Sequence, residues 1–227
     1  MNGYTIIDKI TIEDHISFIR INPTNIELTL KEVFESLANL CWINDFDKDY
    51  VKQSFQVRAE ATVKYISDNI INSADDAITS DSGEYVISEL ARESIITELN
   101  YSDIPLGELI KEQKSGNPGF DFYSENNINV LLFGEAKYIA DRNAYGSAFK
   151  QIVRFENEKR DIADLQDIDK FCSEESLLNV TKGNKGFIAA FASKTIATDK
   201  LIENIKANAE FNILKNFDEL ICVAVNI

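Results

Sequence analysis

The order of apolar and polar residues predicts strands and helices that alternate over most of the chain. Continuous or alternating apolar runs typical of strands occupy residues 15–21, 120–124, 128–138, 187–192 and 220–225. Apolar residues recur at helical spacing in residues 28–43, 50–71, 81–99, 144–159, 160–178 and 197–216. Such an alternation indicates an α/β fold with a central sheet flanked by helices.

The pattern also divides the chain near residue 80. Residues 1–80 look like a mainly helical extension with short strands, and they contain no motif with recognisable chemistry. The regular alternation of strands and helices runs from 81 to 227. We therefore expect an N-terminal extension over 1–80 and the main α/β domain over 81–227. Within that domain, a connection rich in Gly and Pro spans 100–119, with one helical turn near Leu106–Ile110.

The predicted strand at 128–138 carries the most informative group of residues. Its run Val130–Phe133 is apolar on both faces, as expected of a strand that is covered on both sides. Glu135 and Lys137 end this strand two residues apart, so they point to the same face, while Ala136 points to the packed face. Asp121 lies in the preceding short strand and reaches Glu135 if the register of the two strands permits.

Two carboxylates and an amine at the end of an apolar strand suggest phosphodiester chemistry with a divalent metal. Mg²⁺ prefers carboxylates, carbonyls and water as ligands, and a lysine can stabilise developing negative charge. An ion pair of Lys137 with Glu135 or Asp121 at the edge of the sheet is an equally good interpretation of these residues. The triplet alone carries little weight, because Glu112–Lys114 is also Glu-x-Lys but follows no strand.

The helix predicted at 81–99 offers a further carboxylate. Asp81 and Glu84 have the spacing of a capping box, which is a purely structural role. Glu84 also falls within the apolar arc of the helix, so it can point into a site. Glu89 and Glu93 lie with Arg92 on the opposite, polar side.

Composition narrows the possible classes of function. The single histidine, His15, excludes zinc and nuclease motifs that need several histidines in one chain. The three cysteines are scattered, which indicates reduced thiols rather than a disulfide framework or a zinc site. No apolar run is long enough to span a membrane, and the N-terminus lacks the layout of a signal peptide. We expect a cytoplasmic protein without membrane contact.

The charge is strongly negative but unevenly distributed. The net charge is −15, and residues 1–110 hold 8 Lys and Arg against 20 Asp and Glu. Residues 111–200 hold 13 against 14 and are nearly neutral. Such a chain is not expected to bind nucleic acid tightly alone, so a nucleic-acid substrate would have to be presented by a partner.

Residues 81–193 resemble the PD-(D/E)xK nuclease superfamily, which has the restriction-endonuclease-like fold. The family pattern is a helix, a strand with Asp, a strand ending in (D/E)xK, a helix and a strand. It matches the helix at 81–99, GFDFYS at 119–124, NVLLFGEAKY at 129–138, the helix at 144–159 and GFIAAFAS at 186–193. Gly119 and Phe120 precede Asp121, where the superfamily name has Pro-Asp.

The resemblance implies a role for each matched residue. Asp121 and Glu135 would bind Mg²⁺, or Mn²⁺ in its place, with the carbonyl of Ala136, and Lys137 would assist the attacking water. Many members also have a helical Glu before the Asp strand and a polar residue on the following helix. Those residues are matched by Glu84, with Glu89 as second choice, and by Gln151.

The spacing is most similar to that of bacterial defence nucleases, such as those of Hachiman-type anti-phage systems, which act beside a helicase. It implies Mg²⁺-dependent cleavage of DNA that a partner such as a helicase delivers. Two alternatives remain: a non-catalytic interaction protein on the same fold, and an RNA-directed nuclease. An enzyme acting on small molecules is disfavoured, because the chain has neither a P-loop nor a GxGxxG motif.

Overall fold

The computed structural model describes residues 3–68, 80–111 and 119–227, with the side chains of residues 80–82 excepted. The strands in this part of the chain are β1 (Tyr4–Glu13), β2 (Ile16–Pro23), β3 (Phe122–Glu125), β4 (Leu131–Lys137), β5 (Gly186–Ser193) and β6 (Glu219–Asn226). The helices are α1 (Ile26–Ala38), the 3₁₀ helix η1 (Cys41–Asp45), α2 (Asp49–Ile66), α3 (Ser80–Leu99), α4 (Gly107–Ile110), α5 (Tyr145–Asn157), α6 (Arg160–Ile168), α7 (Glu174–Thr181), α8 (Thr198–Lys206) and α9 (Ala209–Leu214).

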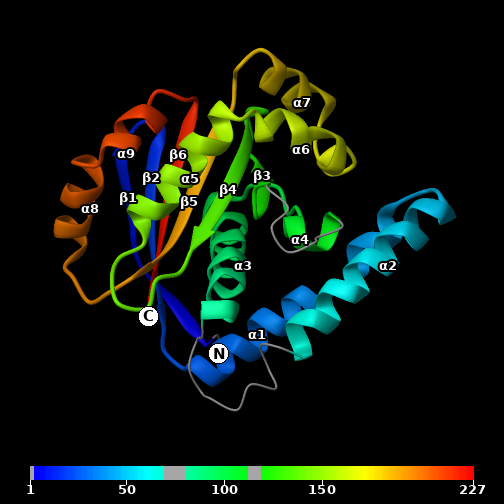
Figure 1. The fold of residues 1–227 in the computed structure, drawn as a ribbon, viewed down its shortest axis with the longest axis horizontal. Helices are drawn as coiled ribbons and strands as arrows, with labels where there is room; N and C mark the ends of the chain where they lie inside the picture. The colour runs from blue at the N-terminus through cyan, green and yellow to red at the C-terminus, as the bar shows by residue number, and fades with distance from the viewer. Residues whose placement is uncertain (1–2, 69–79, 112–118) are drawn as a thin grey trace.

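The six described strands form one mixed sheet in the order β1-β2-β6-β5-β4-β3 (Figure 1). β2, β6, β5 and β4 run parallel to one another, whereas β1 and β3 pair antiparallel at the two edges. This arrangement confirms the α/β class and the mixed sheet flanked by helices. The carboxyl ends of the four parallel strands therefore lie on the same side of the sheet. β3 begins on that side, because it is antiparallel to β4.

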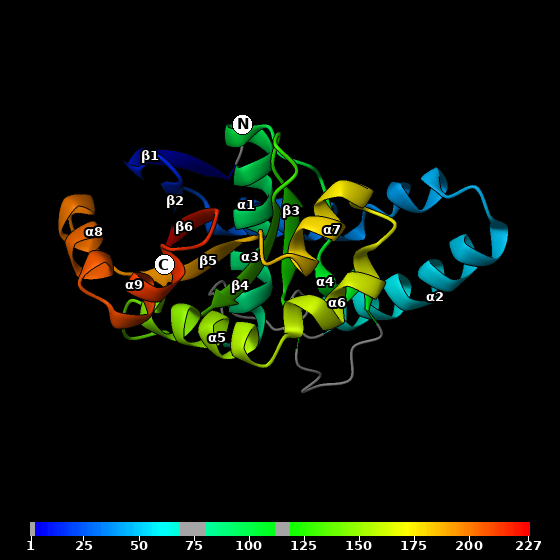
Figure 2. The ribbon, with the colours of Figure 1, turned by 90° about the horizontal axis from the view of Figure 1, so that it is seen from above.

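Helices cover the sheet and enclose an aromatic core. α5 packs against β4 and β5, and Figure 2 shows it along one side of the strands, whereas α3 packs against β3, β4 and β5. Phe120 and Phe133 contact each other, and Phe120 also contacts Phe155 of α5, with ring centroids 5.2 and 5.3 Å apart. α2 projects away from the sheet (Figures 1 and 2). No helix of the described residues combines the length and the apolar character that crossing a bilayer requires.

The first two strands are integral parts of the sheet. β2 is hydrogen-bonded to β6 in parallel register from Ile16 to Ile21, and both of these side chains are fully buried. The expected extension over 1–80 therefore contributes two long strands to the sheet that also contains β3 to β6. The apolar side chains of β2 are buried beside β6. The division of the chain at residue 80 remains a prediction.

Three predicted helices are shorter or interrupted. The helix expected at 28–43 ends at Ala38, because Asn39 is extended and its side chain accepts the N–H of Cys41 at 3.2 Å. The helix expected at 197–216 breaks into α8 and α9 at Asn208, which caps α9 by accepting the N–H of Phe211 at 2.9 Å. The stretch at 160–178 divides into α6 and α7, with Ser173 as the N-cap of α7. Side chains that bond to nearby backbone groups end helices in this way.

Candidate active site

The candidate site lies where β3 begins and β4 ends. Phe122 pairs with Gly134 in the antiparallel ladder, and continuing this register by one residue places Asp121 opposite Glu135. The short strand starts at Phe122, so Asp121 immediately precedes it instead of lying within it as predicted. The register nevertheless brings the two carboxylate-bearing residues together as the alternation suggested.

Asp121 is held by its backbone and by its side chain. Its N–H donates to the carbonyl of Gly134 at 2.9 Å, and its own carbonyl accepts the N–H of Gly107 at 2.7 Å. One carboxylate oxygen, Oδ2, accepts the N–H of Ala136 at 2.8 Å. A Cβ on Gly107 would lie 2.9 Å from the Asp121 carbonyl oxygen, so only glycine permits this approach of α4. The position of Asp121 is therefore fixed before any ligand binds.

Glu135 is a fully buried carboxylate whose charge is balanced by few neighbouring groups. Its exposed fraction is 0%, and neither carboxylate oxygen makes a regular hydrogen bond within the described chain. The Lys137 ammonium lies 2.8 Å from Oε1 and is its ion-pair partner. Burial, followed by the charge of Asp121, raises the pKa of Glu135 well above its usual range, although Lys137 opposes this shift. Additional positive charge next to a buried carboxylate of this kind would stabilise its ionised form.

Lys137 links this pair to α3. Its Nζ lies 3.1 Å from Oε1 of Glu84 as well as 2.8 Å from Glu135. Burial lowers the pKa of Lys137, but the charges of Glu135, Asp121 and Glu84 outweigh burial and raise it above the usual lysine value. Lys137 is therefore an ammonium group beside these carboxylates while they carry no metal.

Glu84 reaches the site from the first turns of α3. Its side chain is 45% exposed, so it lies at the rim. The helix approaches closely at Gly83, where a Cβ would lie 2.4 Å from Cγ of Tyr138. The predicted capping box with Asp81 involves a side chain outside the described residues. Glu84 thus joins the site through its contact with Lys137.

Glu89, the second choice for the helical carboxylate, lies elsewhere. It is 1% exposed, and its carboxylate bonds to Ser36 of α1 and to Arg92. The polar side predicted for Glu89 and Arg92 is buried at these two residues, because α1 covers this face of α3 and the two charges neutralise each other.

Gln151 and Ala136 have different positions relative to the carboxylates. Gln151 is partly buried on α5, and no hydrogen bond among the described residues joins it to Asp121, Glu135 or Lys137. Ala136 is fully buried, as expected for a small residue on the packed face, and its main chain binds Asp121. The second triplet, Glu112–Lys114, lies outside the described residues.

Glu108 of α4 is a further acidic residue at the site that sequence reasoning missed. It is 7% exposed, and its Oε2 has no hydrogen-bond partner within the described chain. Burial and then the charge of Asp121 raise the pKa of Glu108 to about 8. Burial likewise raises the pKa of Asp121 to about 6, against the opposing effect of Lys137. The sequence feature that could have revealed Glu108 is its position as a charged residue inside the otherwise apolar run 104–110.

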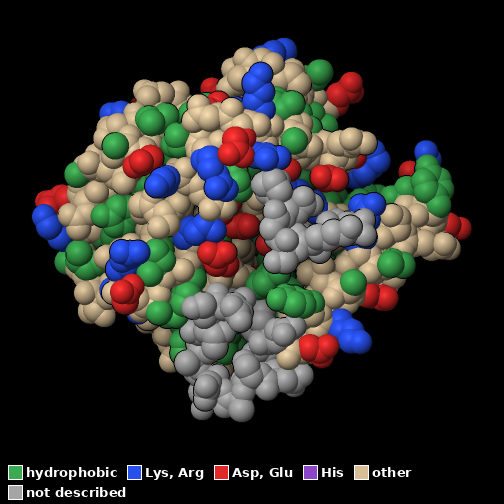
Figure 3. Space-filling model, viewed as in Figure 1, with side chains coloured by type: hydrophobic (Ala, Val, Ile, Leu, Met, Phe, Trp, Pro, Cys, Tyr) green, Lys and Arg blue, Asp and Glu red, His purple; other side chains and the backbone are tan. Residues whose placement is uncertain are grey.

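The donor atoms suit a hard cation. Glu84, Glu108, Asp121 and Glu135 act electrostatically on one another, so acidic groups outnumber the nearby Lys137 and Lys111. Acidic and basic side chains meet over the end of β4 near the centre of the face in Figure 3. No set of three or more His, Cys, Asp or Glu side chains in the described ranges is arranged to hold a metal. The expected ligand set is smaller, with two carboxylates and one main-chain carbonyl.

Comparison with protein-family models, with curated proteins and with solved structures finds no match for this chain. The geometry of the site is therefore the basis on which a function can be inferred.

Proposed function

We propose that this protein is a Mg²⁺-dependent nuclease that hydrolyses phosphodiester bonds in DNA. The observation that carries the proposal is the fully buried Glu135 carboxylate, opposite Asp121 and 2.8 Å from the Lys137 ammonium. The pKa values of both acids are raised by burial and by neighbouring negative charge, so a divalent cation would stabilise their ionised forms.

Asp121 and Glu135 would hold the metal together with the main-chain carbonyl of Ala136. All three provide oxygen donors, which Mg²⁺ prefers and Mn²⁺ also accepts. When bound, the metal supplies an activated water and neutralises charge on the phosphorus centre. The hydrogen bond from Ala136 to Oδ2 of Asp121 leaves Oδ1 of that carboxylate available as a ligand.

Lys137 would contact the reacting phosphate as a cation. As an ammonium group it would stabilise negative charge on the phosphate and orient the attacking water. Glu84 positions the ammonium from the other side, at 3.1 Å. The role proposed for Gln151 is to contact the substrate or the water from α5, which requires its side chain to approach the carboxylates.

Cleavage of supercoiled plasmid in the presence of Mg²⁺ tests this function. Replacing Glu135→Gln or Lys137→Met should lower the rate by about 10²–10³-fold, because each change removes a charge from the site. Glu125→Gln is the matched control: Glu125 is also a buried glutamate of the sheet, but it bonds to Ser173. Unchanged nicking by either site variant, with Glu125→Gln equally active, would refute the assignment.

A non-catalytic interaction protein is the second candidate. The ion pair between Glu135 and Lys137 favours it, because a paired lysine alone accounts for a charged residue at the end of a strand. Electron paramagnetic resonance with Mn²⁺ separates the two functions without relying on activity. A nuclease should bind Mn²⁺ with an affinity that falls at least about tenfold in Asp121→Asn. Mn²⁺ binding of equal affinity in the wild type and in Asp121→Asn would favour the non-catalytic role.

The biological setting is part of the same proposal. We place the chain among the effectors of bacterial anti-phage defence, in the cytoplasm, with DNA delivered by a partner such as a helicase. The succession of α3, β3, β4, α5 and β5, with α4 inserted before β3 and α6 and α7 before β5, supports a restriction-endonuclease-like core. Parallel assays on plasmid and on structured RNA decide between DNA and RNA as substrate, and cleavage confined to RNA would replace the DNA assignment.

A further inference from the structure

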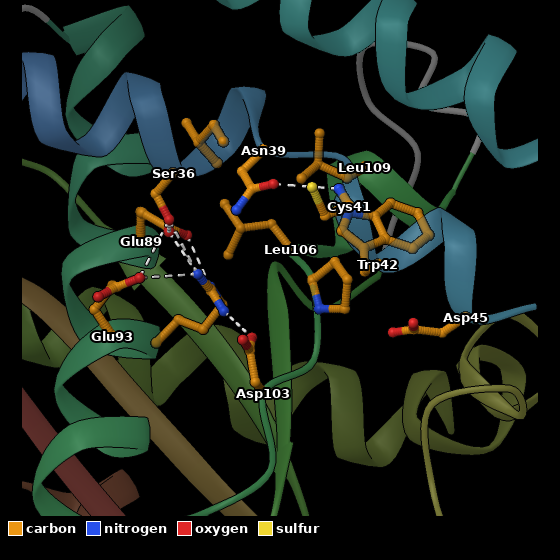
Figure 4. A pocket seen from close by; sticks show the side chains of 13 residues that line it. Ser36, Asn39, Cys41, Trp42, Asp45, Glu89, Glu93, Asp103, Leu106 and Leu109 are labelled. Carbon is orange, nitrogen blue, oxygen red and sulfur yellow. Dashed lines mark hydrogen bonds and ion pairs between the residues drawn. The ribbon is translucent and has the colours of Figure 1, made fainter.

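A separate cavity of about 480 Å³ lies beside α3, on the side that faces α1 and η1. Its volume is within the usual range for small-molecule sites. None of the residues lining it belongs to the candidate active site. Figure 4 shows Glu89, Glu93 and Asp103 converging at one end of the cavity, while Trp42 and Leu109 lie toward the other end and Leu106 lies between the two groups.

The guanidinium of Arg92 at the base of this cavity already has its partners. Its Nε and Nη2 donate to the two carboxylate oxygens of Glu89, at 2.9 and 2.7 Å. Nη2 also lies 3.2 Å from Glu93, and Nη1 bonds to Asp103. Because these N–H groups already donate to carboxylates, Arg92 has little hydrogen-bonding capacity left for an incoming anion.

The cavity therefore carries an excess of negative charge. Besides Glu89, its lining includes Asp45, Glu93 and Asp103, against the single cation Arg92. Burial and then the charge of Glu89 raise the pKa of Glu93, although Arg92 and a hydrogen bond from Ser36 oppose the shift. The side chains of Glu93 and Asp103 are 36% and 68% exposed, so a ligand can reach both from solvent.

The opposite wall is aromatic and apolar. Trp42 lies among Phe46, Phe55 and Phe171, with ring centroids 5.5 to 6.2 Å from its own, so the indole is firmly packed. Its buried Nε1–H has no hydrogen-bond acceptor within the described chain. This apolar wall, opposite the carboxylates, suits the aliphatic part of a ligand whose charged group lies at the acidic end.

We propose that this cavity binds a small organic cation, with an ammonium or guanidinium group on a short aliphatic chain. The charged group lies at Glu93 and Asp103, and the aliphatic chain lies against Trp42 and Leu106. A free amine and a basic side chain of another protein share this chemistry. The proposal is independent of the nuclease function, because the two sites share no lining residue.

Trp42 is the only tryptophan of the chain, so its fluorescence reports on the cavity directly. Agmatine serves as the free amine, acetyl-Gly-Arg-Gly-amide as the protein side chain, and succinate as an anion of similar size. At least one cation should change the emission saturably and with an affinity that falls as salt is raised, whereas succinate should not. Comparison of agmatine with the peptide identifies the source.

Variants show where the cation binds. The double change Glu93→Gln with Asp103→Asn should weaken binding at least about tenfold, and Glu93→Gln alone about threefold. Glu35→Gln is the matched control, because Glu35 is an exposed residue of α1 outside the cavity. Circular dichroism verifies folding, and the single variant carries the test if the double variant is unfolded.

Two results would overturn the proposal. One is the absence of a saturable change with either cation up to about 10 mM, which corresponds to less than about 3 kcal/mol of binding. The other is a response that Glu93→Gln and Glu35→Gln alter to the same extent.

Discussion

At the scale of single residues, the fold raises the pKa values of acids that lie beside one another. The pKa of Glu108 rises to about 8 and that of Asp121 to about 6, both mainly through burial. The native state therefore holds more protons than the unfolded state between about pH 4 and pH 8. Stability without metal falls as pH rises through this window, because ionisation is easier in the unfolded chain.

Replacing Glu108→Gln tests this coupling. The neutral amide removes a charge whose ionisation the fold opposes, so at pH 8 the variant should be more stable than the wild type by about 1–3 kcal/mol. At pH 5 the two should agree within about 1 kcal/mol, because Glu108 is then largely protonated in the native state. Urea unfolding in the absence of metal at both pH values measures the difference. Glu158→Gln, an exposed residue, is the control, and a variant that is less stable at pH 8 would contradict the shift.

Part of the candidate site was predictable from residue spacing. The alternation of a strand placed Glu135 and Lys137 on one face and Ala136 on the other, and the hairpin allowed Asp121 to approach them. The position of Glu108 in an apolar run marked it as unusual but could not place it beside Asp121, because it lies in a connection rich in Gly and Pro whose path depends on contacts with distant residues. The distinction between Glu84 and Glu89 also depended on which neighbouring element covers each side of α3.

At the scale of elements, α6 anchors the start of β3. Asp164 of α6 accepts the N–H of Phe120 at 3.0 Å and the hydroxyl of Tyr123 at 2.6 Å. The ammonium of Lys111, which follows α4, lies 2.7 Å from the same carboxylate. These contacts join α4, α6 and β3 immediately beside Asp121.

A double-mutant cycle measures this anchor. Asp164→Asn alone should cost about 3–5 kcal/mol of unfolding free energy, because it leaves the buried Lys111 ammonium without its carboxylate. Adding Lys111→Met should recover part of that loss, since the unpaired charge is then removed as well. Urea unfolding of the wild type and the three variants gives the coupling energy. Strictly additive effects would show that the ion pair does not join the two elements.

Strands were easier to predict than helix ends. The continuous apolar runs of β4, β5 and β6 are visible in the sequence because both faces of these strands are covered. The C-terminus of α1 and the N-terminus of α9 depend on hydrogen bonds to the side chains of Asn39 and Asn208. The spacing of apolar residues does not reveal these bonds. The burial of Arg92 and Glu89 was not predicted for a related reason, since hydrophobic spacing cannot detect polar side chains that neutralise each other under a neighbouring helix.

At the scale of the whole molecule, net charge opposes the proposed substrate. A charge of −15 repels the DNA backbone, and the acidic residues are concentrated in residues 1–110. The strand order β1-β2-β6-β5-β4-β3 could not be predicted, because it depends on pairing between segments far apart in the chain. The α/β class itself followed from the alternation of strands and helices.

The isolated protein should therefore bind DNA weakly. We expect the cleavage-deficient Glu135→Gln variant to bind a duplex with a Kd above about 10 µM at physiological salt, within or beyond the range of non-specific binding. Fluorescence anisotropy of a labelled duplex at two salt concentrations measures this affinity. A submicromolar Kd for the isolated chain would remove the need for a partner that delivers the DNA.

The pairing of β2 with β6 has a consequence for synthesis of the protein. Roughly 200 residues separate these strands, yet they are hydrogen-bonded neighbours in the sheet. On a ribosome adding about 5–20 residues per second, β2 has to wait about 10–40 s for its partner. During that time the buried face and open edge of the first hairpin have no native partner. A nascent chain interrupted before residue 219 would expose them, which makes this hairpin a natural client for chaperones that bind emerging polypeptides.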